Sequence, residues 1–311
     1  MDKALVVEHL VKSYANAQVK AVNDISFSVK KGSLFAFLGG NGAGKSTTIN
    51  IICSILDKDS GKITIEGYDL DKEGQAIKGL IGVTFQNSVI DDKLTVYDNL
   101  LIRASFYCGD KKKTKEDVNR IIKLLELEPI LNKQVRKLSG GQKRRVDIAR
   151  AIVHSPKFLI LDEPTTGLDP NTRLVVWNLI DKIRKETGMT VFLTTHYLEE
   201  ADKATYVVIM DHGSIIAEGT PNELKNKYSN DYILCYKRKD EDFEELLNED
   251  KIQFTYNPEH KVYALEIKDS KNAKEILNKY DEQITDFEIK KGNMDDVFLN
   301  VTGKGITTNE N

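Results

Sequence analysis

Four short runs of consecutive apolar residues lie along the first two thirds of the chain. They are Leu34–Leu38, Phe158–Leu161, Val191–Leu193 and Val207–Met210. A strand covered by helices on both faces shows such a run, because neither of its alternating sets of side chains meets water. The four runs therefore predict strands of a buried, mostly parallel sheet.

Two other regions of this part follow different periods. Residues 62–66, Lys-Ile-Thr-Ile-Glu, alternate between polar and apolar, which is typical of an antiparallel strand with one wet face. Between about residues 95 and 153 the period is helical, and one helix is expected to end before Pro129. The apolar positions that share a face of that helix are Val118, Ile121, Ile122, Leu125 and Leu127. The pattern predicts an α/β core with an antiparallel β subdomain and a helical subdomain.

The last quarter of the chain has its own pattern. After a linker or short helix and turn near residues 219–231, the expected order is strand, helix, strand, strand, helix, strand. This βαββαβ order is that of a small ferredoxin-like α+β unit. A final helix is expected at 294–299. We therefore expect a first domain at 1–225, with its helical subdomain at about 95–153, a second domain at 231–302, and a disordered tail at 303–311.

Composition limits the class of protein. A chain of 311 residues with a formal net charge of −3 has no basic excess, so no nucleic-acid partner is expected. The basic run Lys111–Lys115 is interpreted as a solvated loop, with a membrane-surface or partner contact as the alternative. Three scattered cysteines (Cys53, Cys108, Cys235) predict a reducing compartment and no metal site of their own. No apolar window is long enough to span a bilayer, so we expect a cytoplasmic protein.

The strongest chemical signal is a glycine-rich loop between an apolar strand and a predicted helix. It follows the pattern G-x-x-x-x-G-K-S and consists of Gly39, Gly40, Asn41, Gly42, Ala43, Gly44, Lys45, Ser46 and Thr47. Glycines let successive backbone N–H groups point at one anion, and the helix that follows adds its positive N-terminus. Lys45 is expected to reach the β- and γ-phosphates of a nucleotide, and the Ser46 hydroxyl to ligate Mg²⁺. An ordinary strand-to-helix turn is the alternative.

Two carboxylates follow the second apolar run. Asp162 ends the predicted strand, where a carboxylate beside a phosphate loop is placed to hold Mg²⁺ through water. Glu163 lies one residue further on, where a general base can polarise a water in line with the γ-phosphate. Two surface acids at a strand end are the alternative. The phosphate loop in the same chain favours the catalytic interpretation.

A second glycine-rich turn precedes a helix whose face is formed by Val146, Ile148, Ala149, Ala151 and Ile152. The turn is Leu138-Ser139-Gly140-Gly141-Gln142, and it predicts a second helix N-terminus able to receive an anion. A simple helix cap formed by Ser139 is the alternative. The chain therefore has two predicted anion-binding helix starts.

In this order the motifs resemble those of the nucleotide-binding subunit of an ATP-binding cassette (ABC) transporter, over roughly residues 4–225. Leu138–Gln142 is similar to the signature motif of that family. The resemblance implies a head-to-tail homodimer or heterodimer with two shared sites. In each site the signature turn of one subunit would close over ATP held by the phosphate loop of the other subunit. The residues of that turn that would contact the nucleotide are Ser139, Gly140, Gly141 and Gln142.

The resemblance implies four further roles. Tyr14 would stack on adenine, Gln86 would sense Mg²⁺ and the membrane partner, and Asp169 would couple the two sites across the dimer. His196 would contact the γ-phosphate and orient the attacking water. Plain packing of Tyr14 and an incidental His196 are the alternatives. Lys45, Glu163 and His196 are thus the predicted catalytic residues, with Ser46, Gln86 and Asp162 around Mg²⁺.

One residue departs from the family pattern. Gly40 stands where phosphate loops of this family commonly have proline. The change affects only backbone geometry and the entropy of the unfolded chain, on the order of 0.4–1 kcal/mol. ATP binding is expected to survive it.

The resemblance implies an ATP-hydrolysing subunit, peripheral on the inner face of the cell membrane, that drives separate transmembrane permease subunits. Residues 294–303 resemble the C-terminal extension of daunorubicin-resistance-type exporter ATPases. We therefore expect export of a drug, antibiotic, lipid or similar amphipathic substrate. The alternatives are a soluble ABC-type ATPase acting on ribosomes or DNA, and an immunity or regulatory module without transport. For the extension, subunit contact, regulation and stabilisation of the cassette all stay open.

Overall fold

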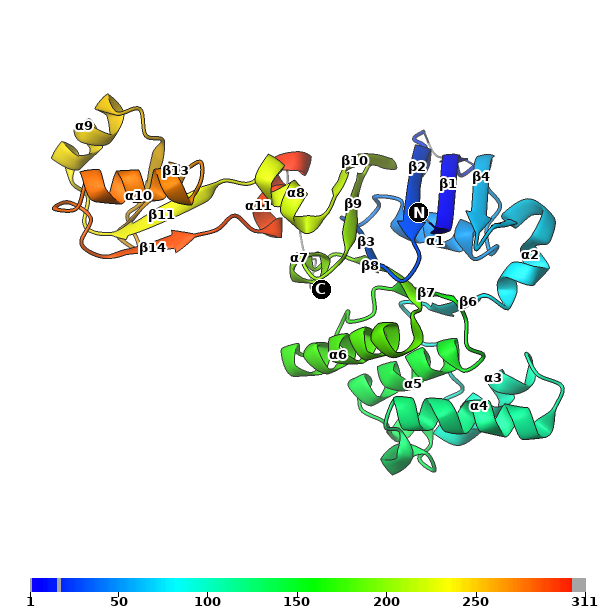
Figure 1. The fold of residues 1–311 in the computed structure, drawn as a ribbon. Helices are drawn as coiled ribbons and strands as arrows, with labels where there is room; N and C mark the ends of the chain where they lie inside the picture. Colours follow the sequence, from blue (N-terminus) through cyan, green and yellow to red (C-terminus); the bar gives the residue numbers. More distant parts are fainter. Residues whose placement is uncertain (1, 16–17, 304–311) are drawn as a thin grey trace. The chain divides into compact units, whose positions relative to one another are not determined.

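The computed structural model describes residues 2–15 and 18–303 (Figure 1). The chain divides between Thr220 and Pro221 into two compact units. Apart from Gly303, the expected tail at 303–311 lies outside the described residues. The division places the short helix after Thr220 with the second unit.

The core of the first unit is a six-stranded sheet in the order β10-β9-β3-β8-β7-β6. All neighbours are parallel except the edge strand β10, which pairs antiparallel with β9. The strands are β3 (Leu34–Gly39), β6 (Ile81–Thr84), β7 (Phe158–Asp162), β8 (Thr190–Thr195), β9 (Tyr206–Asp211) and β10 (Ser214–Gly219). Every residue of β3, β7 and β8 is buried, which confirms the parallel sheet predicted from the continuous apolar runs.

A second, antiparallel sheet packs on the core sheet of the same unit. Its order is β2-β1-β4-β5, with β1 (Lys3–Lys12), β2 (Val22–Lys30), β4 (Ser60–Ile65) and β5 (Tyr68–Asp69). The two sheets meet through an aromatic cluster, in which the ring centroid of Phe27 lies 5.7 Å from that of Phe35 and 5.2 Å from that of Phe37. Through this packing the antiparallel sheet supports β3 and, with it, the start of the phosphate loop.

The helices of the first unit fall into two groups. One group flanks the sheets: α1 (Lys45–Ile52), α2 (Leu70–Lys78), α6 (Pro170–Thr187) and α7 (Leu198–Ala201). The other forms the helical subdomain: α3 (Val96–Ser105), α4 (Lys111–Leu124) and α5 (Gly140–Ile152), with 3₁₀ turns at Glu128–Ile130 and Val135–Lys137. Figure 1 shows α3, α4 and α5 gathered together, with α6 beside α5.

The prediction of a loop at Lys111–Lys115 is wrong. These residues form the first turns of α4, because the Asp110 side chain caps the helix by accepting from the backbone N–H of Lys112. The four lysines of the run remain exposed, while Thr114 between them is buried. The basic run is therefore the solvated face of a helix.

The second unit is a four-stranded antiparallel sheet in the order β12-β13-β11-β14. Its strands are β11 (Asp231–Tyr236), β12 (Phe254–Asn257), β13 (Val262–Ile267) and β14 (Phe287–Lys290), and its helices are α8 (Pro221–Tyr228), α9 (Glu241–Glu249), α10 (Ser270–Lys279) and α11 (Met294–Thr302). Figure 1 shows α9 and α10 on one side of the sheet, where they bury Phe243, Leu247 and Ile276 against it. The strand order and pairing are those of a ferredoxin-like unit, as the sequence predicted.

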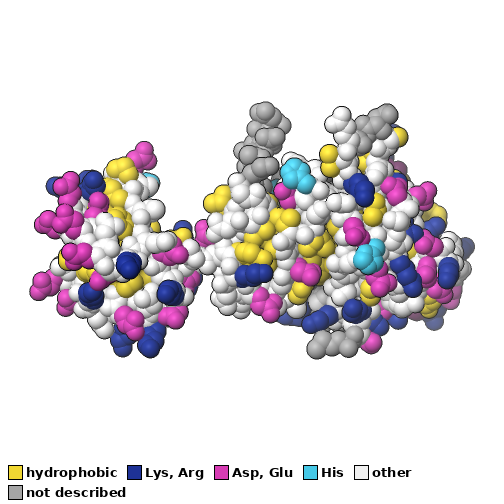
Figure 2. Space-filling view, turned by 90° about the horizontal axis from the view of Figure 1, so that it is seen from above, with side chains coloured by type: hydrophobic (Ala, Val, Ile, Leu, Met, Phe, Trp, Pro, Cys, Tyr) yellow, Lys and Arg dark blue, Asp and Glu magenta, His cyan; other side chains and the backbone are white. Residues whose placement is uncertain are grey.

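On the face drawn in Figure 2, acidic and basic side chains are interspersed over each unit, with apolar side chains exposed between them. Within residues 2–15 and 18–303, none of the helices combines the length and the apolar composition needed to cross a bilayer.

Candidate functional site

The phosphate loop connects β3 to α1 at the carboxyl edge of the core sheet. Gly42 and Gly44 turn the backbone with φ values of +79° and +104°. A Cβ atom on Gly44 would lie 2.3 Å from the carbonyl oxygen of Ala21, and one on Gly39 would lie 2.6 Å from that of Met210. Gly39 and Gly44 are therefore required by close packing of backbone on backbone.

The middle of the loop is open. No heavy atom lies within 4 Å of the position a Cβ would take on Gly40, and Asn41 is exposed. Ala43 is buried, and its backbone N–H donates to the carbonyl of Gly40 at 3.2 Å. Packing therefore does not require glycine at position 40.

Lys45 and Tyr14 lie at the two ends of this loop. The ammonium of Lys45 is buried and donates to the carbonyls of Gly39 at 2.7 Å and Gly40 at 3.0 Å, and burial lowers the pKa of this group. Tyr14 is 45% exposed, with its hydroxyl 3.2 Å from that of Thr47 in the first turn of α1. A flat aromatic ring thus lies open to solvent beside the loop, and Ser46 is exposed next to it.

Asp162 ends β7 on the strand two places from β3. Its side chain is 7% exposed and accepts a 2.5 Å hydrogen bond from the hydroxyl of Thr194 at the end of β8. Burial raises the pKa of this carboxyl, while the Thr194 bond and the charge of Lys45 oppose the change. A carboxylate at this depth, near a lysine ammonium, matches the protein part of a hard-cation site.

Glu163 is the centre of a cluster from three loops. Its Oε2 atom accepts from Gln86 Nε2 at 3.0 Å and from the Thr166 hydroxyl at 3.0 Å, and lies 3.5 Å from Nδ1 of His196. The imidazole of His196 is the largest cause that lowers the pKa of the Glu163 carboxyl. The structure thus brings together three sequence-predicted residues, Gln86, Glu163 and His196, that lie far apart in the chain.

The backbone at Glu163 is also unusual. Its φ of +46° lies in the left-handed region, which is strained for a residue with a side chain. The Glu163 N–H donates to the Thr194 hydroxyl at 3.0 Å, so a single threonine holds both Asp162 and Glu163. The strand end is therefore fixed in a conformation that turns the Glu163 carboxylate toward Gln86 and His196.

The second glycine-rich turn starts α5 as a capping box. Ser139 Oγ accepts from the N–H of Gln142 at 3.3 Å, and Gln142 Oε1 accepts from the N–H of Ser139 at 3.2 Å. A Cβ on Gly141 would lie 2.3 Å from Cγ2 of Thr172 on α6, so glycine is required there. Ser139 is thus a helix cap, as the simpler interpretation held, and the box leaves the N–H groups of Gly140 and Gly141 directed out of the helix start.

Asp169 caps the neighbouring helix. Its carboxylate accepts from the backbone N–H of Thr172 at 3.0 Å, and hydrogen bonding to Thr172 lowers the pKa of the carboxyl. Its hydrogen bonds, like those of Ser139 and Gln142, stay within its own turn. Among the described residues of one chain, Ser139, Gln142 and Asp169 therefore share no hydrogen bond with the phosphate loop.

Arg144 is a site residue that the sequence reasoning missed. It is 7% exposed and donates to four backbone carbonyls: those of Phe85, Asp162, Glu163 and Pro164, at 2.7–3.1 Å. It thus ties α5 to the loop before Gln86 and to the end of β7. The available signal was its position four residues before Ile148, on the apolar face of α5, where an arginine is rarely buried without partners.

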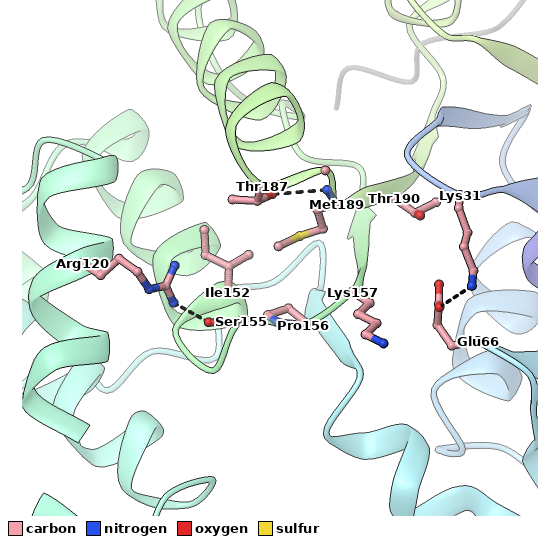
Figure 3. Close-up of a pocket in the computed structure, with 11 residues that line it drawn as sticks. Lys31, Glu66, Arg120, Ile152, Ser155, Pro156, Lys157, Thr187, Met189 and Thr190 are labelled. Atoms are coloured by element: carbon pink, nitrogen blue, oxygen red, sulfur yellow. Dashed lines mark hydrogen bonds and ion pairs between the residues drawn. The ribbon is translucent and has the colours of Figure 1, made fainter. Parts of the chain in front are cut away.

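A separate cavity of about 360 Å³ lies at the opposite edge of the core sheet (Figure 3). It is bordered by Lys157 and Thr190, which stand at the amino ends of β7 and β8. Three of its charged side chains are engaged in contacts: Lys31 pairs with Glu66 at 3.2 Å, and Arg120 donates to the Ser155 hydroxyl at 2.6 Å. In open α/β sheets ligands bind at the carboxyl ends of the strands, so this cavity is not the nucleotide site.

Comparison with known protein families gives two matches. The family model described as "ABC transporter" matches residues 22–166. The one described as "ATP-binding protein DrrA1-3-like, C-terminal domain" matches residues 219–302. The second match covers the ferredoxin-like unit.

Individual proteins show the same similarity. The daunorubicin/doxorubicin resistance ATP-binding protein DrrA of Streptomyces peucetius is 33% identical over 310 residues, which cover 97% of this chain and 93% of that protein. The linearmycin resistance ATP-binding protein LnrL of Bacillus subtilis is 37% identical over 231 residues, covering 74% of this chain and 73% of that protein.

Two solved structures show the fold of the first unit. CbiO1 from Clostridium perfringens, part of the ABC transporter complex cbiONQ, superposes with a TM-score of 0.67 at 33% identity, covering 72% of this chain and 91% of that one. The dimeric cassette MJ0796 bound to ADP and Pi gives a TM-score of 0.63 at 26% identity, covering 70% of this chain and 98% of that one.

Proposed function

The chain belongs to the ABC transporter family of ATP-binding proteins, and from that premise we propose that it is the ATP-hydrolysing subunit of an exporter. The observation that supports this most strongly is the similarity over nearly the whole chain to a drug-resistance ATP-binding protein, second unit included. The geometry at the carboxyl edge of the core sheet supplies the groups that the reaction requires.

Nucleotide binding is assigned to the phosphate loop and Tyr14. The backbone N–H groups of Gly39–Thr47 and the start of α1 would cradle the phosphates, and the Lys45 ammonium would exchange its two carbonyl bonds for phosphate oxygens. Tyr14 would stack on the adenine from its exposed position beside Thr47. These groups hold the substrate in line with the Glu163 cluster.

Mg²⁺ is assigned to Ser46, Gln86 and Asp162. The residues fit the ion: Mg²⁺ takes one or two carboxylates with phosphates and waters, and the Asp162 carboxylate is buried at the strand end near Lys45. The Nε2 atom of Gln86 donates a hydrogen bond to Glu163, so the Oε1 atom of Gln86 would be available to a metal-bound water. When bound, the ion neutralises charge on the β- and γ-phosphate oxygens.

Glu163 is assigned as the general base. A glutamate is ionised at neutral pH, and the imidazole of His196 lowers the pKa of this carboxyl further, so the carboxylate is present to accept a proton from the attacking water. Gln86 and Thr166 donate to the same Oε2 atom and orient it. His196, 3.5 Å away, would hold the γ-phosphate and the base in one geometry.

The second glycine-rich turn is assigned to the partner subunit's nucleotide. The side-chain hydrogen bonds of Ser139 and Gln142 join only these two residues. The backbone N–H groups at the start of α5 point out of the helix and are available to an anion. A head-to-tail homodimer or heterodimer would place Ser139, Gly140, Gly141 and Gln142 of one subunit over the phosphates held by the other, with Asp169 at the seam. Hydrolysis would then depend on association.

This arrangement predicts complementation between two inactive variants. Lys45→Ala removes the phosphate contact, and Ser139→Arg blocks the signature turn, so each variant alone should lose ATPase activity. In a mixture, each heterodimer has one site with both an intact Lys45 and an intact Ser139. If the sites act independently, activity should return to about a quarter of that of the native chain. A mixture that forms dimers yet stays inactive would contradict sharing of the site.

The export function requires a membrane-spanning partner, and α3 offers a contact for it. Ile102 lies in this helix, and Phe106 is the C-cap residue that follows it; they are 46% and 75% exposed. Two neighbouring exposed apolar side chains can form part of a larger apolar contact with another protein. We assign this surface to the permease subunit; a chain bound there would lie at the inner face of the membrane.

Export is tested by searching the neighbouring reading frames for one that encodes a membrane-spanning protein and expressing the chain together with it. Cells with both proteins should accumulate less of a fluorescent amphipathic compound than cells with either one alone. Phe106→Asp should abolish this effect and copurification of the two proteins, while ATP binding persists. Ile55→Asp, at another exposed apolar residue of the first unit, is the matched control. Full ATPase activity without any export by the wild-type pair would favour the regulatory or immunity function.

A further inference from the structure

Glu200 is a buried carboxylate that none of the roles above uses. It lies in the short helix α7, just after His196, and is 1% exposed. Removing a carboxylate from water is costly, and a carboxylate retained at such a position normally has specific partners. Its partners here come from three different elements.

Three neutral donors converge on the Glu200 carboxylate. Oε1 accepts from the hydroxyl of Thr165 and from Nε1 of Trp177, the latter at 2.9 Å. Oε2 accepts from the hydroxyl of Thr195 at 2.6 Å. Thr165 and Thr195 are themselves buried, with 0% and 1% exposure. The two carboxylate oxygens thus accept hydrogen bonds from three side chains at once.

Two of these donors belong to the segments that carry the catalytic pair. Thr165 lies two residues after Glu163, and Thr195 lies immediately before His196. The third donor, Trp177, is on α6 and belongs to neither segment. Glu200 therefore bridges the turn after β7 to the end of β8, and anchors the bridge on α6.

The bridge has a counterpart on the other side of β8. Successive residues of a strand point to opposite faces. Thr194 bonds to Asp162 and to the N–H of Glu163 on one face, and Thr195 bonds to Glu200 on the other. The Thr195 hydroxyl also accepts from the N–H of Tyr197 at 2.9 Å, so the backbone on both sides of His196 is held.

We propose that Glu200 is a positioning residue for ATP hydrolysis, which fixes the Glu163 turn and the His196 turn relative to each other. The inference rests on the roles proposed above for Glu163 and His196. These side chains stand 3.5 Å apart, and they reach this distance from segments that are separated by more than thirty residues in the chain. The distance between the Glu163 and His196 side chains therefore depends on the contacts that join the two turns.

The test compares variants of the full chain in steady-state ATP hydrolysis. Glu200→Ala removes the acceptor of both turns and should lower kcat by about 10- to 100-fold, since a displacement of about 1 Å at a reacting group has an effect of this size. KM for ATP should change by less than about threefold, because the phosphate loop and Tyr14 are held by other contacts. Glu200→Gln keeps one carbonyl oxygen and the shape, and should recover most of the lost kcat.

Trp177→Phe separates positioning from stability. It removes the third hydrogen bond to the same carboxylate and leaves both turns bonded, so it should lower the melting temperature with little change in kcat. Thr165→Val and Thr195→Val each break one side of the bridge and should lower kcat without raising KM.

The outcomes distinguish this inference from the proposed function. If Glu163→Gln abolishes hydrolysis while Glu200→Ala keeps the native kcat, the positioning role is wrong and the site assignment stands. If Trp177→Phe lowers kcat as much as Glu200→Ala at an equal loss of stability, Glu200 is only structural. If Glu163→Gln leaves hydrolysis intact, the assignment of the base itself is wrong.

Discussion

Replacing Glu163 by glutamine should lower the rate of ATP hydrolysis by about 10²- to 10⁴-fold, the usual contribution of a positioned general base. The amide cannot accept the proton of the attacking water. It preserves the size of the side chain and an oxygen that can still accept from Gln86 and Thr166. ATP binding should therefore persist, since Lys45 and the phosphate loop are unchanged.

The variant should also change association. If ATP joins the two subunits and hydrolysis separates them, Glu163→Gln should accumulate as a dimer in the presence of ATP, which size-exclusion chromatography measures directly. Glu199→Gln makes the same chemical change at an exposed carboxylate on α7 and should behave as the native chain. A Glu163→Gln protein that hydrolyses ATP at the native rate would remove Glu163 from the mechanism.

Replacing Arg144 by methionine should destabilise the first unit by about 3–5 kcal/mol, because four carbonyls that share one guanidinium would lose their donor in a buried place. Burial also lowers the pKa of this arginine, but no accessible pH removes its charge. For a unit of this size the loss corresponds to a fall in melting temperature of roughly 10 °C, measured by scanning calorimetry.

Arg145 provides the matched control on the same helix. It donates to the carbonyls of Leu125 and Glu126, both in the helical subdomain, and one of these bonds is exposed. Arg145→Met should therefore cost only about 1 kcal/mol. Arg144→Met should in addition lose ATPase activity, because the loops of Gln86 and Glu163 are both tied to it. Equal melting temperatures for the two variants would contradict the role of Arg144.

The architecture was largely predictable because its signals are local. Continuous apolar runs predicted β3, β7, β8 and β9, and these strands are buried on both faces because helices and a second sheet cover them. The order of short elements predicted the ferredoxin-like unit, and the strand pairing of the structure agrees. The exception was Lys111–Lys115, where charge indicated exposure correctly but said nothing about backbone conformation.

The candidate site divides in the same way. The glycines of the phosphate loop, the acids after β7 and the histidine after β8 were visible in the sequence, since each follows a strand whose carboxyl end faces the same edge of the sheet. The partners of these residues were not visible. Thr194 bonds to a carboxylate and a backbone N–H, Arg144 to backbone carbonyls, and Glu200 to two hydroxyls and an indole. Such bonds leave no spacing pattern in the chain.

The sequence by itself determined the family, the strands of the core and the candidate residues for the chemistry, because apolar period, glycine at strained turns and charged side chains are properties of short segments. Tertiary structure alone decided how those residues are held. Arg144 reaches a carbonyl 59 residues away and Glu200 reaches a hydroxyl 35 residues away. Such bonds form because a buried polar group must find a partner in the folded chain, and only folding determines which partner lies within reach.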